Sequence, residues 1–155
     1  MAQSDLICPA DKKIYTIRDQ TGTVPSLPLI CSSIMSKKLA EGISGLVLDI
    51  KVVNGTFMKT MEQARNLGSW MKKIGTAFNI ETDIVFTNMS QPLGRFAGLA
   101  CEVQESINAL KGNGPKDLMD VPFELGANLL IQAKLAHHKD EAIQLQKSLI
   151  DSRKA

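Results

Sequence analysis

Four polar side chains near the N-terminus have the types and the spacing of a ligand-binding site. Tyr15 and Arg18 lie three residues apart, and Ser33 and Lys37 lie four apart. Residues three or four apart share a face of a helix, so each pair faces one way if its segment is helical. Arginine offers a rigid fork of donors, lysine a mobile charge, serine a hydroxyl and tyrosine a ring with a polar tip. Such a set suits a planar, neutral ligand that becomes anionic during a reaction.

The same residues also have an ordinary structural explanation. Arg18 could pair with the carboxylate of Asp11 or Asp19, and Lys37 could simply be solvated, as most charged side chains are. Spacing alone favours this second explanation. The elements that position these residues, and the motifs that follow them, are needed to decide.

Composition restricts the class of protein. The 155 residues suffice for one domain with a core, and 18 basic against 16 acidic residues give a net charge of +2, which argues against nucleic-acid binding. Cys8, Cys31 and Cys101 lie too far apart for a zinc site or a disulfide framework. The sequence has no signal-peptide pattern and no apolar run of the ~18 residues that a membrane span needs. We therefore expect a soluble, cytoplasmic chain without nucleic-acid or membrane partners.

Hydrophobic patterning predicts an α/β fold. The expected helices cover about residues 26–41, 60–75, 99–110, 118–136 and 140–153, and the expected buried strands cover 45–53 and 82–88. Ser26 is expected to cap the first of these helices, and Gly42 and Gly75 to end the first two. Strand–helix–strand order predicts parallel pairing through a right-handed crossover. Two strands leave their edges uncovered, so either unrecognised segments add strands or the chain is part of a larger unit.

Several blocks of the sequence resemble the thymidine and pyrimidine-nucleoside phosphorylases, in the same order. The blocks are DKKIYTIRDQTGTVPSLPLICSSIMSKKLAEG, LVLDIKV, GTFMKT, MSQPLGRFAGLACEVQESINALKGNGPKDL and ELGANLLI. The resemblance runs from about Asp5 to the C-terminus. It implies a helix-rich fragment of a two-domain phosphorylase. Residues 1–42 would belong to the helical domain with its base-binding helix, and 43–155 to a partial α/β domain with a mixed or parallel sheet and flanking helices.

The resemblance implies phosphorolysis, in which phosphate converts a pyrimidine nucleoside into free base and pentose 1-phosphate. The family residues that line the pyrimidine pocket match Tyr15, Arg18, Ser33 and Lys37, which assigns these four to substrate binding and Arg18 and Lys37 to catalysis. As the glycosidic bond breaks, negative charge spreads over the base and its carbonyl oxygens. Fixed cationic donors then stabilise the transition state more than the neutral substrate.

The resemblance also implies a bound potassium ion and no organic cofactor. Its ligands in this segment would be the backbone carbonyls of Leu93 and Phe96 and the carboxylate of Glu105. Such a cation prefers oxygen ligands, which this set provides. The alternative for Glu105 is an acid on a helix surface.

The family's glycine-rich phosphate loop has no match in these 155 residues, and the glycines at 112 and 114 indicate a turn instead. Three hypotheses follow. The chain could be a phosphorylase segment that carries the base-binding half of the site, one chain of a split enzyme completed by a complementary phosphorylase chain, or a non-catalytic remnant or interaction module. Because phosphate is the co-substrate, we expect the isolated chain to be inactive. A homodimer is also possible, since the family dimerises through its helical domain.

Local departures from the family pattern lie near the expected site. Val53 stands where the family usually has glycine, Asn54 where it has a small residue, and Asn88 where it has aspartate. A β-branched valine cannot adopt a positive φ without strain. The departures therefore indicate that the amino-acid sequence of these loops is less constrained here than in the family.

Overall fold

The computed structural model of the chain describes residues 9–53 and 56–154. Along the chain, the elements of this part are α1 (Pro9–Gln20), α2 (Leu27–Ala40), β1 (Gly45–Val52), α3 (Met61–Ala77), β2 (Glu81–Asn88), α4 (Leu99–Asn108), the short π-helix η1 (Ala109–Asn113), α5 (Lys116–Gln132) and α6 (Lys139–Asp151). No helix in this part is long and apolar enough to cross a membrane. Cys8 and Asn54 lie outside the described residues.

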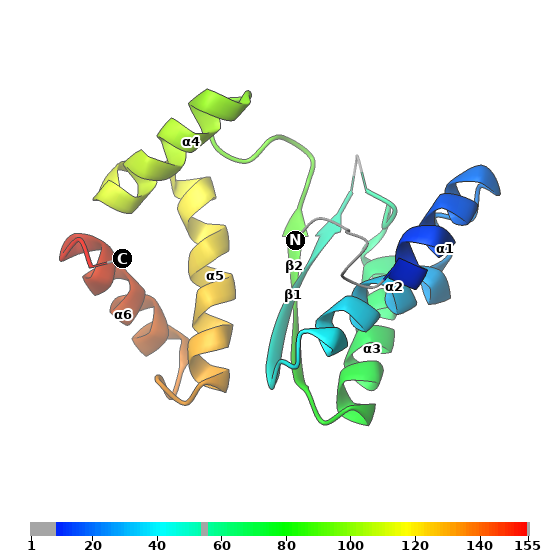
Figure 1. Cartoon of the computed structure of the whole chain (residues 1–155). Helices are drawn as coiled ribbons and strands as arrows, with labels where there is room; N and C mark the ends of the chain where they lie inside the picture. The colour runs from blue at the N-terminus through cyan, green and yellow to red at the C-terminus, as the bar shows by residue number, and fades with distance from the viewer. Residues whose placement is uncertain (1–8, 54–55, 155) are drawn as a thin grey trace.

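The two strands form a parallel sheet with helices on both faces (Figure 1). The register runs from Gly45 opposite Glu81 to Val52 opposite Asn88. α2 and α3 lie on one side of the sheet, α5 lies on the other, and α6 packs against α5. The predicted α/β class, with its helix-rich composition and parallel pairing, is confirmed. The predicted division at residue 42 stays a prediction.

Helix boundaries follow local signals, with two corrections. Thr60 Oγ1 accepts a hydrogen bond from Gln63 N at 3.2 Å, and Gln63 Oε1 accepts one from Thr60 N at 3.3 Å, so a capping box begins α3. Gly75 does not end this helix. A Cβ at position 75 would collide with the Thr82 side chain, so glycine allows α3 to approach β2 closely. Ser26 occupies the N-cap position of α2 but makes no side-chain cap bond.

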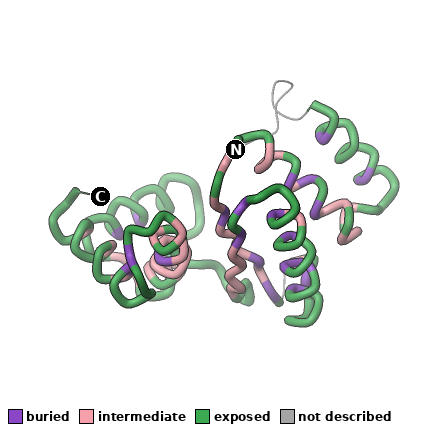
Figure 2. Tube along the Cα trace, turned by 90° about the horizontal axis from the view of Figure 1, so that it is seen from below, coloured by how far each residue is buried: buried purple, intermediate pink, exposed green. Residues whose placement is uncertain are grey.

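The main hydrophobic core lies between one face of the sheet and the helices α2 and α3 (Figure 2). Its buried members are Cys31, Met35, Leu46, Ile50, Val52, Met58, Ala64, Leu67, Met71 and Ile80. Alternate residues of a strand point to opposite faces, so Leu46, Ile50 and Val52 all enter this core. Burial raises the pKa of the Cys31 thiol, which packs as a small apolar side chain.

Val53, directly after β1, has a φ of +85°. Its N–H donates to the carbonyl of Met58 at 3.2 Å and closes the loop that follows the strand. Few β-branched residues adopt this left-handed region, because the branched side chain crowds the backbone. The structure therefore places valine in the conformation for which the family's glycine is suited.

Candidate functional site

Helix α1 aligns three polar residues toward α2. The segment that carries Tyr15 and Arg18 is helical, as their shared face requires. Asp11 precedes Tyr15 by four residues and Arg18 by seven, so all three lie along one side of α1. Asp11 and Arg18 are buried, whereas Tyr15 is 40% exposed.

Asp11 binds two polar residues of α2, Ser33 and Lys37. Lys37 Nζ donates to Asp11 Oδ2 at 2.7 Å and to Ser33 Oγ at 3.0 Å, while Ser33 Oγ donates to the same carboxylate oxygen at 3.1 Å. The Lys37 side chain is 24% exposed. The structure therefore brings Ser33 and Lys37 together, as their spacing indicated, and Lys37 is held by a buried carboxylate rather than merely solvated. A fixed ammonium and hydroxyl form a preorganised pair of donors.

Sequence reasoning missed the role of Asp11, which it considered only as a partner for Arg18. The available signal was periodicity, because Asp11, Tyr15 and Arg18 follow an i, i+4, i+7 pattern on α1. Positions four apart along α2 then present Ser33 and Lys37 to the same interface. The two patterns together predict an interhelical polar cluster.

Arg18 anchors the connection between α1 and α2. Its Nη1 donates to the carbonyl of Leu29 at 3.2 Å, and its Nη2 donates to that of Val24 at 2.5 Å. The guanidinium carbon lies 5.4 Å from the centroid of the Tyr15 ring, within the range of a cation–π contact. The hydrogen bonds of the Arg18 side chain thus go to backbone carbonyl oxygens. The sequence-based alternative, in which Arg18 pairs with the carboxylate of Asp11 or Asp19, is wrong.

The guanidinium retains donor capacity. Each Nη carries two N–H groups, and the bonds to Leu29 and Val24 use one on each nitrogen. Nε is buried and has no hydrogen-bond partner in the described part of the chain. Leu29 lies one helical turn before Ser33, so Arg18 and the Asp11 cluster occupy the same α1–α2 interface at neighbouring levels. Among the described residues, Asp11 makes an ion pair with Lys37, whereas the hydrogen bonds of Arg18 go to backbone carbonyls.

The loop before α4 lies against Glu105, the expected cation ligand. Glu105 is 6% exposed, and its Oε1 accepts a hydrogen bond from Arg95 N at 2.9 Å. A side chain at Gly94, where φ is +78°, would collide with this carboxylate, so glycine permits the close approach. Glu105 is therefore buried against the segment that carries the Leu93 and Phe96 carbonyls, and it is not a helix-surface acid. This oxygen-only donor set fits a hard cation.

The glycines at 112 and 114 form a packed turn between helices. Gly112 has a φ of +85° at the end of η1, and a Cβ at Gly114 would crowd Ala109 and Met119. The segment is the turn that its sequence predicted.

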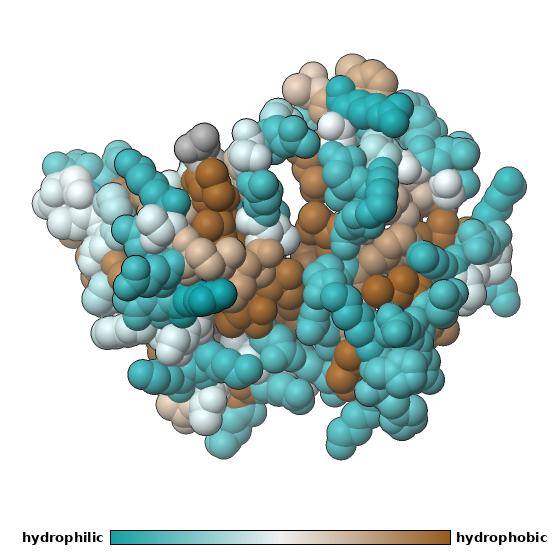
Figure 3. All heavy atoms as spheres, turned by 180° about the vertical axis from the view of Figure 1, so that it is seen from behind, coloured by the Kyte–Doolittle hydropathy of each residue, from teal (hydrophilic) through white to brown (hydrophobic). Residues whose placement is uncertain are grey.

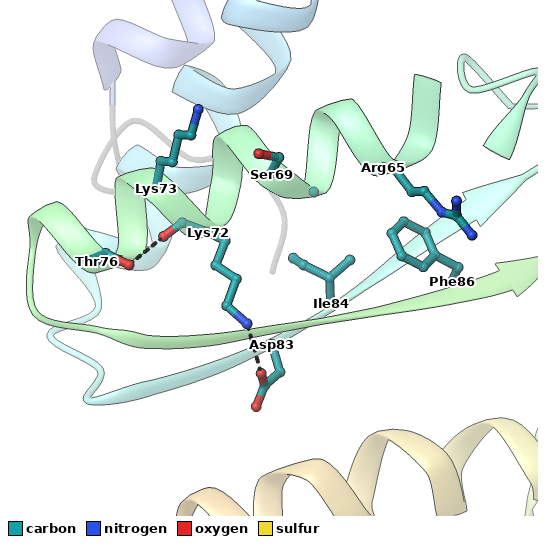
Figure 4. Close-up of a pocket in the computed structure, with 9 residues that line it drawn as sticks. Arg65, Ser69, Lys72, Lys73, Thr76, Asp83, Ile84 and Phe86 are labelled. Atoms are coloured by element: carbon teal, nitrogen blue, oxygen red, sulfur yellow. Dashed lines mark hydrogen bonds and ion pairs between the residues drawn. The ribbon is translucent and has the colours of Figure 1, made fainter. Parts of the chain in front are cut away.

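A separate cavity of about 560 Å³ lies between α3 and β2 (Figure 4). Its polar lining includes Arg65, Ser69, Lys72, Lys73, Thr76 and Asp83. Lys72 Nζ lies 3.5 Å from Asp83 Oδ1, which makes a largely exposed ion pair. None of the four residues predicted to bind a base lines this cavity.

Comparison with known proteins places the whole chain in one family. Residues 1–155 match the "Glycosyl transferase family, a/b domain". The chain is 49% identical over 152 residues to the pyrimidine-nucleoside phosphorylase of Staphylococcus aureus (strain bovine RF122 / ET3-1), covering 98% of this chain and 35% of that protein. It is 47% identical over 155 residues to the enzyme of the same name from Staphylococcus epidermidis (strain ATCC 12228 / FDA PCI 1200), covering 100% of this chain and 36% of that protein. The resemblance to the phosphorylases is confirmed, and the chain spans about a third of their length.

Proposed function

Because the chain belongs to this glycosyl transferase family, we propose that it carries the pyrimidine-binding half of a nucleoside phosphorylase site. The observation that carries the proposal is the cluster in which the buried Asp11 holds Lys37 and Ser33. The names of the relatives support the substrate class, a pyrimidine nucleoside. The reaction would be phosphorolysis of that nucleoside to free base and pentose 1-phosphate.

In this proposal each residue has a distinct role at the base. Lys37 and Arg18 donate to the base carbonyls, Ser33 contacts the ring edge, and Tyr15 supports the guanidinium of Arg18 from its ring face. Asp11 is a positioning residue, since it fixes the Lys37 ammonium at 2.7 Å. Negative charge develops on the base as the glycosidic bond breaks, so donors that are already oriented stabilise the transition state without further reorganisation.

A potassium ion would be held by Glu105 and the carbonyls of Leu93 and Phe96. The burial of Glu105 and its bond to Arg95 N support this assignment. When bound, the ion would supply positive charge that orders the loop before α4. The described residues contribute only oxygen ligands to it.

Phosphate binding would come from sequence outside these 155 residues, either within one longer polypeptide or on a complementary phosphorylase chain. The coverage of about a third of the relatives supports both arrangements. A homodimer is a third possible assembly. The competing function is that of a non-catalytic remnant or interaction module, which the exposed apolar side chains of α4 favour.

Binding of free base tests the proposed site. The 155-residue chain should bind uracil or thymine in a calorimetric titration, and Lys37→Met should weaken that binding about tenfold or more, because a hydrogen bond from a charged donor is lost. Lys38→Met is the matched control, since Lys38 pairs with Glu41 at the surface at 3.1 Å. Equal affinities for the two variants would contradict the site.

The same polypeptide should release no base from uridine in the presence of phosphate. Robust turnover by the 155 residues alone would contradict the division of the site into two halves. Absence of base binding by the unaltered chain would instead favour the non-catalytic function.

A further inference from the structure

The outer edge of β2 has no strand paired with it in the described part of the chain. Glu81 N donates to the carbonyl of Ser44, directly before β1, at 3.2 Å, so Glu81 directs its backbone groups toward β1. Successive residues of a strand direct these groups alternately to one side and the other. Ile84 and Phe86 lie three and five positions further along β2 and therefore direct theirs to the outer edge. Free N–H and C=O groups of this kind are a template for a further strand.

A hollow lies on each side of this edge. The cavity of Figure 4, of about 560 Å³, lies on the α3 side, and a second cavity of about 510 Å³ lies on the α5 side. Ile84 and Phe86 line both cavities. The alternate side chains of a strand occupy the two faces of its sheet. A strand beside Ile84 and Phe86 would therefore find room for both sets of its side chains.

The cavity on the α3 side is positively charged. Arg65, Lys72 and Lys73 line it together with one carboxylate, that of Asp83. The side chains of Arg65 and Lys73 make no hydrogen bond or ion pair with any residue that the structure describes. Three cations against one carboxylate leave an excess of two positive charges. Such an excess attracts acidic side chains.

The charges beside the cavity on the α5 side are balanced. Its carboxylates, Asp120 and Glu124, pair with Lys116 at 2.5 Å and with Lys139. The other α5 residues that line it are uncharged. Uncharged side chains therefore suit this side of the edge, whereas acidic ones suit the α3 side.

Lys72 crosses the edge near the amino end of β2. Asp83 is the third residue of the strand, and its Oδ2 accepts a hydrogen bond from Gln132 Nε2 of α5 at 2.8 Å. Asp83 thus faces α5, and Lys72 of α3 reaches past β2 to within 3.5 Å of its Oδ1 (Figure 4). Lysines placed at an edge commonly hinder the addition of a strand. The edge from Ile84 to Asn88 lies beyond this ion pair.

We propose that the edge of β2 from Ile84 to Asn88 binds an extended acidic segment as a third strand of the sheet. The backbone of this segment pairs with Ile84 and Phe86. Its acidic side chains stand at alternate positions and meet Arg65 and Lys72, while the uncharged side chains between them face α5. In strand addition of this kind, backbone bonds give affinity and the alternate side chains give specificity. The inference does not depend on the proposed base site.

A second copy of the chain fits this edge less well. In a symmetric antiparallel pair of β2 strands the twofold axis is perpendicular to the sheet, so equivalent faces lie on the same side. The α3 helices of the two copies would then be neighbours, and Arg65 and Lys72 would meet their own equivalents. Like charges repel, so the charge of the cavity favours an acidic partner over self-association.

The test titrates the full 155-residue chain with a fluorescein-labelled peptide of eight residues, the length of β2, in which threonine and glutamate alternate. Fluorescence anisotropy should show binding, and Arg65→Gln should weaken it about tenfold, because a charged partner is lost. Lys72→Gln should also weaken it. Lys38→Gln is the control, since Lys38 pairs with Glu41 on α2. Thermal melting confirms that each variant is folded.

Methylation of the peptide backbone distinguishes strand pairing from simple attraction of an anion. N-methylation of one alternate set of residues should abolish binding, because it blocks the N–H groups that face β2, whereas methylation of the other set should leave binding intact. A peptide of the same composition with its glutamates in one block should bind about tenfold more weakly, since its carboxylates lie on both faces.

Three results would overturn the proposal. The first is equal affinity for the alternating, block and both methylated peptides, which would show attraction of an anion alone. The second is absence of binding by the alternating peptide. The third is a concentration-dependent dimer of the chain, seen by sedimentation, that excludes the peptide.

Discussion

The two sides of the sheet differ in how much apolar surface they bury. On the side of α2 and α3, large side chains such as Met35 and Met71 are each 1% exposed. Among the C-terminal helices, the buried cluster consists of Ala127, Ala136 and Ala142. Leu99 at the start of α4 is 84% exposed. The first side buries large apolar side chains, whereas the second has small residues at its centre and large apolar ones at its surface.

This difference identifies the part of the molecule that supports the proposed site. α2 carries Ser33 and Lys37 on one side and places Cys31 and Met35 in the core, so the core fixes the position of these polar groups. Val103 and Ile107 of α4 and Leu110 of η1 form an exposed apolar stripe. Figure 3 shows apolar side chains reaching the surface in the middle of the face behind Figure 1 and over the side of the C-terminal helices. A stripe of this kind marks a surface that a partner or a further segment would cover.

The largest expected difference between the two regions concerns apolar truncation. Met71→Ala should lower the free energy of unfolding by about 2–5 kcal/mol, because it removes a fully buried side chain and leaves a cavity. Leu99→Ala should change it by less than about 0.5 kcal/mol, as at other exposed positions. Urea unfolding followed by circular dichroism measures both. Similar losses would show that the C-terminal helices contribute as much core as α2 and α3.

Loss of a buried ion pair between α1 and α2 should also lower the free energy of unfolding more than loss of an exposed ion pair on α5. Asp11→Asn should cost about 1–3 kcal/mol, because Lys37 loses its buried counter-charge and the neutral amide offers Lys37 and Ser33 a weaker acceptor than the carboxylate. Asp120→Asn breaks a pair on α5 in which Lys116 and Asp120 are 2.5 Å apart and 88% and 57% exposed. Its cost should be within about 0.5 kcal/mol, since exposed pairs contribute little. A cost for Asp11→Asn no larger than that for Asp120→Asn would contradict the preorganised cluster.

The smallest expected change in the free energy of unfolding is a stabilisation. Val53→Gly should raise the free energy of unfolding by about 1 kcal/mol, because relief of the positive-φ strain exceeds the entropic cost of glycine. Val52→Gly is the matched control at the adjacent buried strand residue, and it should destabilise the protein. Destabilisation by Val53→Gly would mean that the valine side chain contributes more than its backbone strain costs.

Short-range signals predicted most of the elements. The parallel pair of strands, the helix after Thr60 and the polar face of α2 all follow from periodicity and capping. The sequence could not show that α3 continues through Gly75, since the close approach to Thr82 is a tertiary contact. The role of Asp11 likewise depends on how two helices meet. The family resemblance identified Tyr15, Arg18, Ser33 and Lys37, but the structure was needed to show that Arg18 bonds to carbonyl oxygens.

The central claim is that Tyr15, Arg18, Ser33 and Lys37 bind a pyrimidine base within a complete phosphorylase site. The direct test replaces the matching third of the Staphylococcus aureus enzyme with this chain and measures kcat/KM for release of uracil from uridine. The chimera should be active, and Arg18→Ala and Lys37→Ala should each lower kcat/KM about 100-fold, the typical effect of losing one donor to a developing anion. Lys38→Ala should leave it unchanged. An active chimera in which Arg18→Ala and Lys37→Ala release uracil at the unaltered rate would contradict the account.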